Sequence, residues 1–209
     1  MADEAPPVPP VADPAPLGLA AFALTTFLLS AANAGWMTAA TGSAWLGYAL
    51  AYGGAAQLLA GMWEFKNRNT FGATAFSTYG GFWIGLFLWV QFVAPHAASA
   101  SAADHDLGWI LLAFAIFNTY MLLMSLALNT AVFAVFLTLE ITEIVLFIGN
   151  FAGSSGTVKI GGVIGVITAV AAWYTSAAGV SASIAGNRLR LPVGPALLPP
   201  TAPAVRANA

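Results

Sequence analysis

Near its N-terminus the chain reads Asp13-Pro14-Ala15-Pro16-Leu17-Gly18-Leu19-Ala20-Ala21-Phe22-Ala23-Leu24-Thr25-Thr26, and this stretch is the most informative about the class of fold. A turn made of one acid and two prolines leads directly into an apolar helix with regularly spaced small residues. Asp13 is suited to cap such a helix, and Pro14 is tolerated in the first turn because the amide there has no helical partner to lose. The join is typical of the point at which a chain enters a bilayer.

The composition of the whole chain indicates the same solvent. The 209 residues are 59% hydrophobic and only 7% charged, and the mean hydropathy is +0.82. A soluble domain carries about a quarter charged residues, and a small one cannot hide so much apolar area. The net charge of −2 argues against a nucleic-acid partner, and the lack of cysteine excludes disulfides and thiolate metal sites. We therefore expect an all-α integral membrane protein.

Six segments are long and apolar enough to cross a hydrocarbon core, which takes about 20 residues in a helix. They are expected at about 15–38, 43–64, 70–94, 107–128, 130–150 and 160–184, within a six-helix transmembrane domain spanning 15–185. The flanking tails, 1–14 and 186–209, are rich in Pro and Ala and are expected to be disordered. A polar loop at about 95–106 holds both histidines, and no helix carries a cluster that could bind a metal.

The distribution of basic residues predicts the orientation. Six crossings place both termini on one side. Five of the six basic residues lie on that side: Lys66, Arg68, Arg188, Arg190 and Arg206. Only Lys159 lies on the opposite side. By the positive-inside rule both termini face the cytoplasm of a plasma (inner) membrane.

Small and aromatic residues in the spans have simple structural interpretations. Glycines let helices pack closely in lipid, although Gly53 and Gly54 can also allow a local break in the second span. The seven tryptophans mostly fall near span ends, where an interfacial aromatic belt explains them, and no solute role is expected for Trp36, Trp45, Trp63, Trp83, Trp89, Trp109 or Trp173.

Polar groups inside the spans are costly to leave unpaired, so their placement is informative. Hydroxyls and amides there either tie helices together or line a solute path. The candidates for pore lining or substrate binding are Thr25, Thr26, Asn33, Gln57, Thr78, Thr138 and Asn150.

Two acids, Glu140 and Glu143, are the only ones well inside a span. They lie three residues apart on one helix and therefore share a face. No basic residue in any span can pair with them, and a buried carboxyl without a cation tends to bind a proton. They are candidates for a proton relay, or alternatively for hydrogen-bonded ties between subunits.

Several motifs resemble those of the acetate uptake transporter family, whose bacterial members include the succinate–acetate permeases. The resemblance covers about 13–185 and rests on these stretches: Pro14 to Leu19 with Phe22 and Thr25-Thr26; Asn33-Ala34-Gly35; Tyr52 to Gln57 with Gly61; Asn69 to Phe76 with Tyr79-Gly80 and Phe82-Trp83; and Ile148-Gly149-Asn150. Two departures are Asp13, where the motif usually has Asn, and the acids Glu140 and Glu143 in a stretch that is largely apolar in the family.

The resemblance implies six-helix protomers assembled as a ring-shaped hexamer, each protomer with its own solute path. It implies passage of acetate and other small monocarboxylates, with succinate in some members, either passively or together with protons. By motif position, the family's hydrophobic constriction falls on Phe22 and Tyr79, and by counting back from Asn150 on Leu139.

Other functions remain open from the sequence. The nearest alternative is a channel for a small neutral solute such as urea, a short amide or ammonia, and a more distant one is a membrane sensor or scaffold without flux. An enzyme is not expected, and neither is a cofactor, because no span carries a nucleophile–base pair, metal-ligand spacing or a phosphate loop.

Overall fold

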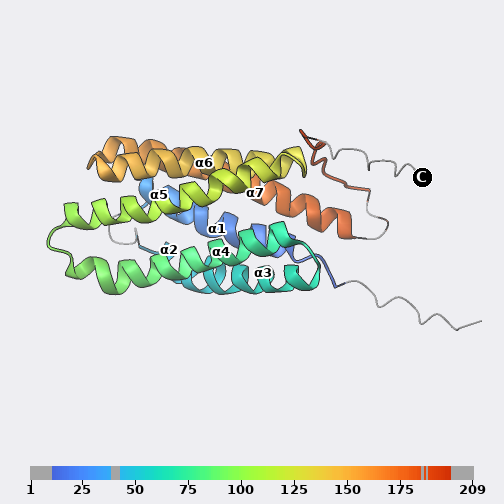
Figure 1. The fold of residues 1–209 in the computed structure, drawn as a ribbon, viewed down its shortest axis with the longest axis horizontal. Helices are drawn as coiled ribbons and strands as arrows, with labels where there is room; N and C mark the ends of the chain where they lie inside the picture. Colours follow the sequence, from blue (N-terminus) through green and yellow to red (C-terminus); the bar gives the residue numbers. More distant parts are fainter. Residues whose placement is uncertain (1–10, 39–42, 185, 187, 199–209) are drawn as a thin grey trace, which may run out of the picture.

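The computed structural model describes residues 11–38, 43–184, 186 and 188–198, and throughout this part of the chain the regular structure is helical. The helices run side by side as an elongated bundle, and both ends of the described chain lie at the same end of it (Figure 1). Among the described residues, five helices are long and apolar enough to cross a membrane: α1 (Ala15–Asn33), α4 (Thr70–Leu88) with its continuation to His96, α5 (Ala100–Ser125), α6 (Thr130–Phe151) and α7 (Ser155–Ser183).

The second crossing expected from the sequence is present as three helical pieces in direct succession: α2 (Trp45–Tyr48), the π-helix η1 (Ala49–Ala56) and α3 (Gln57–Lys66). The helix is not broken at the glycine pair, but it widens there into π-helical turns. A Cβ atom at Gly53 would lie 2.6 Å from Thr25 Oγ1 on α1, so glycine is what lets the two helices approach. With this run included, the chain forms the predicted bundle of six crossings.

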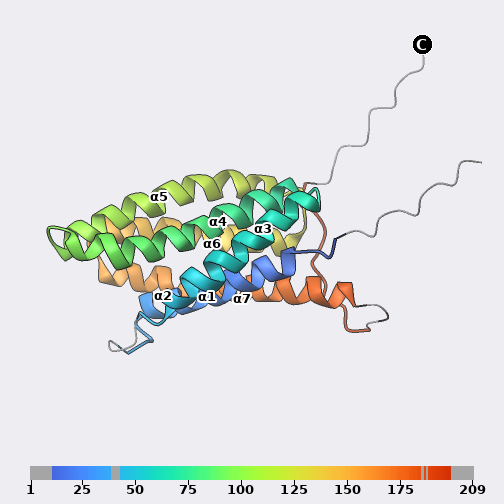
Figure 2. The same ribbon diagram turned by 90° about the horizontal axis from the view of Figure 1, so that it is seen from below.

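Neighbouring crossings pack in a defined order. α1 packs against α7, α7 against α6, and α6 against α5, while α3 packs against α4. Figure 2 shows α5 on the opposite face of the bundle from α1 and α7. A Cβ atom at Gly162 or Gly165 of α7 would collide with Ser30 of α1. Close approach at small residues is the usual source of helix association in lipid.

Two helices begin earlier than their apolar stretches do. α5 starts at Ala100, where the side chain of Ser99 accepts a hydrogen bond from Ala102 N at 3.1 Å. The polar loop predicted at 95–106 is therefore wrong in extent: only the 3₁₀ turn η3 (Ala94–His96) and a short link remain, and His105 lies on α5. Likewise α7 begins at Ser155, capped by Ser154. Hydropathy marks only the part of a helix within the bilayer, whereas the cap marks where its hydrogen bonding starts.

The N-terminal turn differs in detail from its prediction. Pro14, not Asp13, occupies the N-cap position of α1. Asp13 lies one residue before the cap, and its side chain accepts a hydrogen bond from Ala15 N at 2.9 Å. Residues 1–10, most of the predicted N-terminal tail, lie outside the described residues, as do 199–209 with Arg206.

The C-terminal segment 188–198 is not disordered as predicted, because it is hydrogen-bonded to the start of α6, to the residue that follows α5, and to Tyr174 of α7. Val193 O accepts from Ala131 N at 2.9 Å, and Leu198 N donates to Leu126 O at 2.8 Å. Pro192 O accepts from the hydroxyl of Tyr174 at 2.6 Å. These bonds satisfy an exposed amide at the start of α6 and a carbonyl at the end of α5, which are groups that helix ends leave unpaired.

Candidate functional site

A cluster of three apolar side chains from three helices lies at the centre of the bundle. Phe22 of α1, Tyr79 of α4 and Leu139 of α6 are all buried, with exposed fractions of 4–6%. The rings of Phe22 and Tyr79 meet edge to face, with centroids 5.7 Å apart and an interplanar angle of 62°. The three residues predicted as a constriction are therefore adjacent in space.

A wide vestibule opens at the end of the bundle opposite the termini. Its volume is about 600 Å³, and residues of the loops between α1 and α2 and between α6 and α7 contribute to its wall. Asn33 and Asn150, two of the predicted polar residues, line it together with the oppositely charged Asp104 and Lys159.

Below the vestibule lies a smaller space, which we call the Trp83 cavity. It has a volume of about 50 Å³. Besides apolar side chains and the three cluster residues, its lining consists of polar side chains: Thr26, Ser30, Asn33, Trp83, Thr142 and Glu143. Asn33 lines both this cavity and the vestibule, so the two spaces adjoin.

A third space, which we call the Gln57 cavity, lies on the other side of the cluster. Its volume is about 30 Å³, and its only amide is that of Gln57, which is 1% exposed. Phe22, Tyr79 and Leu139 line this cavity as well as the Trp83 cavity. The cluster therefore separates two small cavities, one of which continues to the vestibule.

A hydrogen-bonded network supports Tyr79 from behind. Its hydroxyl lies 3.1 Å from Asn118 Oδ1 and 3.2 Å from Glu143 Oε1. Asn118 in turn donates to Glu140 Oε2 at 2.7 Å, and the hydroxyl of Thr119 donates to Glu140 Oε1 at 2.7 Å. Glu140 is half-buried and lines neither cavity, so the two predicted acids occupy different surroundings. Tyr79 and Asn118 together connect them, and the sequence did not single out Asn118 as a site residue.

Three polar atoms around the Trp83 cavity have no hydrogen-bond partner among the described residues. They are Thr26 Oγ1, Trp83 Nε1 and Glu143 Oε2, and all three residues are at most 6% exposed. Leaving a buried polar atom unpaired costs about 1–3 kcal/mol. Buried groups of this kind normally have a protein, water or ligand partner, and their gathering around one small cavity indicates a place for a polar ligand.

Three of the predicted polar residues lie away from these cavities. Thr25 packs against Gly53, and its hydroxyl lies 3.4 Å from Tyr48 O. Thr138 bonds back to Ala134 O of its own helix at 2.8 Å, as threonines in apolar helices often do. Thr78 lines none of the three spaces described here.

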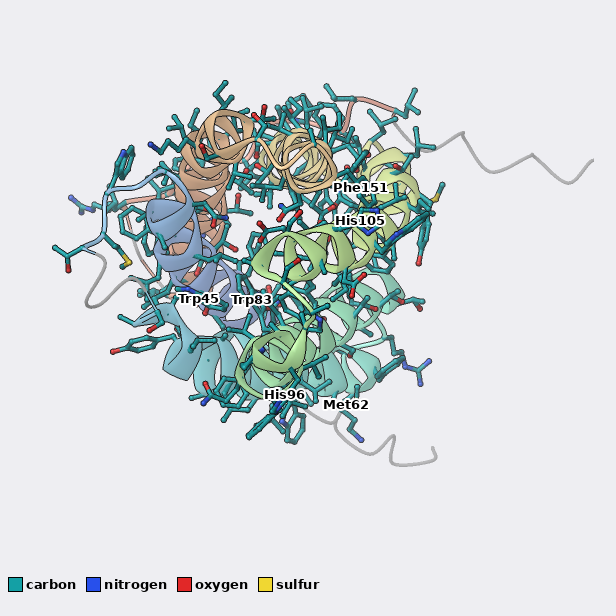
Figure 3. The ribbon with its side chains drawn as sticks, turned by 90° about the vertical axis from the view of Figure 1, so that its left-hand side faces the viewer. Trp45, Met62, Trp83, His96, His105 and Phe151 are labelled. Carbon is teal, nitrogen blue, oxygen red and sulfur yellow. The ribbon has the colours of Figure 1, made fainter. Side chains whose placement is uncertain are left out.

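The tryptophans do not all form an interfacial belt. Trp36, Trp63 and Trp109 are more than half exposed, but Trp45 and Trp83 are 7% and 2% exposed and belong to the core. In the view along the bundle in Figure 3, Trp83 lies near the middle, whereas Met62 lies at the rim. The belt interpretation is therefore wrong for these two tryptophans. Because of it, Trp83 was not predicted to be a site residue.

Comparisons with known proteins agree with this architecture. The profile of the GPR1/FUN34/yaaH family matches residues 3–192. Acetate permease A of Emericella nidulans is 41% identical over 186 residues, which cover 82% of this chain and 62% of that protein. The succinate-acetate/proton symporter SatP of Escherichia coli K12 is 36% identical over 185 residues, which cover 88% of this chain and 96% of that protein.

A solved structure is also similar. The structure of the bacterial acetate channel SatP superposes with a TM-score of 0.79 at 33% identity, covering 88% of this chain and 99% of that one. The chain spans only 62–64% of the length of three fungal relatives that it matches.

Proposed function

The chain belongs to the GPR1/FUN34/yaaH family of multi-pass membrane proteins, and from that premise we propose that it conducts acetate and other small monocarboxylates across the membrane. The solute passes through each protomer between Phe22, Tyr79 and Leu139. One observation carries this proposal: these three side chains line two small cavities at once and form the partition between them. The names of the relatives, an acetate permease and an acetate channel, support the choice of solute.

The chemistry of the partition suits a small acid with an apolar end. Its three apolar side chains strip water from a solute, and a methyl group loses nothing by that exchange, unlike a charged group. On either side, Thr26 and Gln57 offer a hydroxyl and an amide that can replace lost hydration. No lysine or arginine lines the two inner cavities within the described residues, so the carboxyl group meets no fixed cation and binds weakly, which favours transit.

The proposal includes the orientation of the chain in the membrane and its assembly into an oligomer. Lys66, Arg68, Arg188 and Arg190 lie at the end of the bundle that holds both termini, and Lys159 lies at the vestibule. The positive-inside rule then places the termini in the cytoplasm of the inner membrane and the vestibule outside. Apolar side chains exposed along the crossings, such as Ile116, Leu123 and Ile167, face lipid or neighbouring copies in a ring-shaped hexamer.

Flux measured on purified protein tests the proposal. Proteoliposomes should take up labelled acetate faster than protein-free vesicles of the same lipid. The protein-free vesicles are the necessary control because the neutral acid also crosses lipid without a protein. Labelled urea and methylammonium, tested in the same vesicles, represent small neutral solutes and ammonia. Protein-dependent uptake of either without protein-dependent acetate uptake would refute the acetate assignment in favour of the neutral-solute alternative.

A further inference from the structure

We propose that the Trp83 cavity is a binding subsite for one carboxyl group, in which Trp83 and Thr26 donate hydrogen bonds and Glu143 shares a single proton with the solute. This inference rests on the proposed function and names residues that would perform it. It also makes the cavity the place where transport of the acid becomes linked to a proton.

Two unused donors define one side of the subsite. The indole N–H of Trp83 can only donate, and the hydroxyl of Thr26 can donate or accept. Neither has a partner among the described residues, although both side chains are at least 94% buried. They belong to α4 and α1, so they approach the cavity from two helices. A carboxyl group carries acceptor oxygens for both donors at once.

Glu143 also lines the subsite, and its carboxylate would carry the same charge as the carboxylate of the solute. Its Oε1 atom faces the hydroxyl of Tyr79 at 3.2 Å, whereas Oε2 has no partner. A second carboxylate placed against Oε2 would bring two acceptors of like charge together, and such a pair is stable only when a proton lies between them. The proton can arrive on either carboxyl group, but one proton must be present when the solute is bound. It leaves with the solute as the neutral acid, and Glu143 returns to the carboxylate form.

No other group at the cavity can take over that role. The titratable or charged side chains near Glu143 are Tyr79 from α4 and Glu140 from its own helix, and neither supplies a positive charge. α5 contributes the neutral amide of Asn118, and α1 contributes the hydroxyls of Thr26 and Ser30 and the amide of Asn33. No described residue of α7 lines the cavity, and the hydroxyl of Thr168 on that helix is hydrogen-bonded to Thr142 at 3.1 Å. Without a cation, the shared proton is what neutralises the pair.

The size of the cavity selects the solute. One buried water needs roughly 10–15 Å³ of such space, so a cavity of about 50 Å³ accommodates about as many heavy atoms as acetate has. A dicarboxylate such as succinate can place one carboxyl group there only by leaving the other in the vestibule. The subsite therefore favours short monocarboxylates.

The experiment asks whether uptake moves net charge. Labelled acetate uptake is measured as an initial rate at equal pH on both sides, with and without an inside-positive potential set by potassium and valinomycin. Wild-type uptake above that of protein-free vesicles should not respond to the potential, because the acid crosses with its proton. In Glu143→Gln the amide still donates to the solute but carries no ionisable proton. Acetate then crosses as an anion, and its uptake should rise several-fold with the potential.

Matched variants isolate the subsite. Glu140→Gln makes the same change three residues away, at a side chain that lines neither cavity, and should keep potential-independent uptake. Trp83→Phe keeps the ring and removes the donor, so it should raise the apparent KM for acetate by roughly tenfold.

The outcomes separate this inference from the proposed function. Any one of three results would refute the shared proton at Glu143. These are Glu143→Gln uptake that does not change with the potential, wild-type uptake that does change with it, and Glu140→Gln uptake that rises with the potential as predicted for Glu143→Gln. If Glu143→Gln does not fold, wild-type uptake that responds to the potential still refutes the shared proton, and an unchanged apparent KM in Trp83→Phe still refutes the subsite. If no protein shows acetate uptake above that of protein-free vesicles, the proposed function itself fails.

Discussion

Truncating Phe22 to alanine should accelerate flux and weaken the preference for small acids. The Phe22 side chain is 5% exposed and stands between cavities of about 50 and 30 Å³, in edge contact with Tyr79. A solute must separate these rings to pass, and an aromatic pair of this kind contributes about 0.5–1.5 kcal/mol beyond its buried area. Because 1.36 kcal/mol corresponds to a tenfold change in rate, losing the contact should raise acetate flux by a factor of about 2 to 13.

The assay compares initial rates for acetate, butyrate and succinate in proteoliposomes of wild type and variant. The larger acids should gain more than acetate does, since the variant merges the two cavities. The matched control is Phe27→Ala on the same helix, whose ring packs against Trp173 at a centroid distance of 5.3 Å and lines neither cavity. Phe→Ala changes in soluble cores cost about 3–5 kcal/mol, so both variants must first elute as the wild-type assembly. A folded Phe22→Ala protein with unchanged rates and unchanged preference would refute the constriction.

Further variants probe the supports of the site. Tyr79→Phe should lower the thermal midpoint in detergent, because it leaves two buried partners unpaired at roughly 1–3 kcal/mol, while retaining acetate preference in the flux assay. Gly162→Ala should reduce the yield of folded protein in size-exclusion chromatography, because a Cβ atom there would collide with the α1 backbone, whereas Gly81→Ala has no atom within 4 Å and should be tolerated. Tyr174→Phe removes the hydrogen bond to Pro192 O and should speed proteolysis of the C-terminal segment without changing flux.

The architecture could be read from the sequence because lipid imposes strict requirements on it. Apolar stretches of sufficient length predict the crossings, and a side-chain cap such as Asn69, which accepts from Gly72 N at 3.1 Å, marks where α4 begins. The start of α5 escaped prediction because its first turns, with Asp104 and His105, extend beyond the apolar stretch. The C-terminal segment 188–198 escaped for another reason: its order comes from backbone contacts with distant helices, which composition does not reveal.

The site was only partly predictable. Phe22 and Tyr79 lie in distinctive motifs, so resemblance could place them in a shared constriction, and the structure brings Leu139 beside them. In a membrane helix the face toward lipid is as apolar as the face toward the core, so amphipathic periodicity does not separate a pore residue from a surface one. For that reason Trp83, which is buried and lines an inner cavity, was assigned to the interface. Thr138, which bonds back to its own helix and lines neither inner cavity, was assigned to the pore.

The unequal spaces on the two sides of the partition have a consequence for pharmacology. An aromatic or branched acid fits the vestibule of about 600 Å³ but not the cavities of about 50 and 30 Å³ beyond it. Such a compound would act as a blocker with strict sidedness, effective from the vestibule face and inert from the other. In reconstituted vesicles, the fraction of flux that an impermeant blocker abolishes would then report how many copies are inserted in each direction.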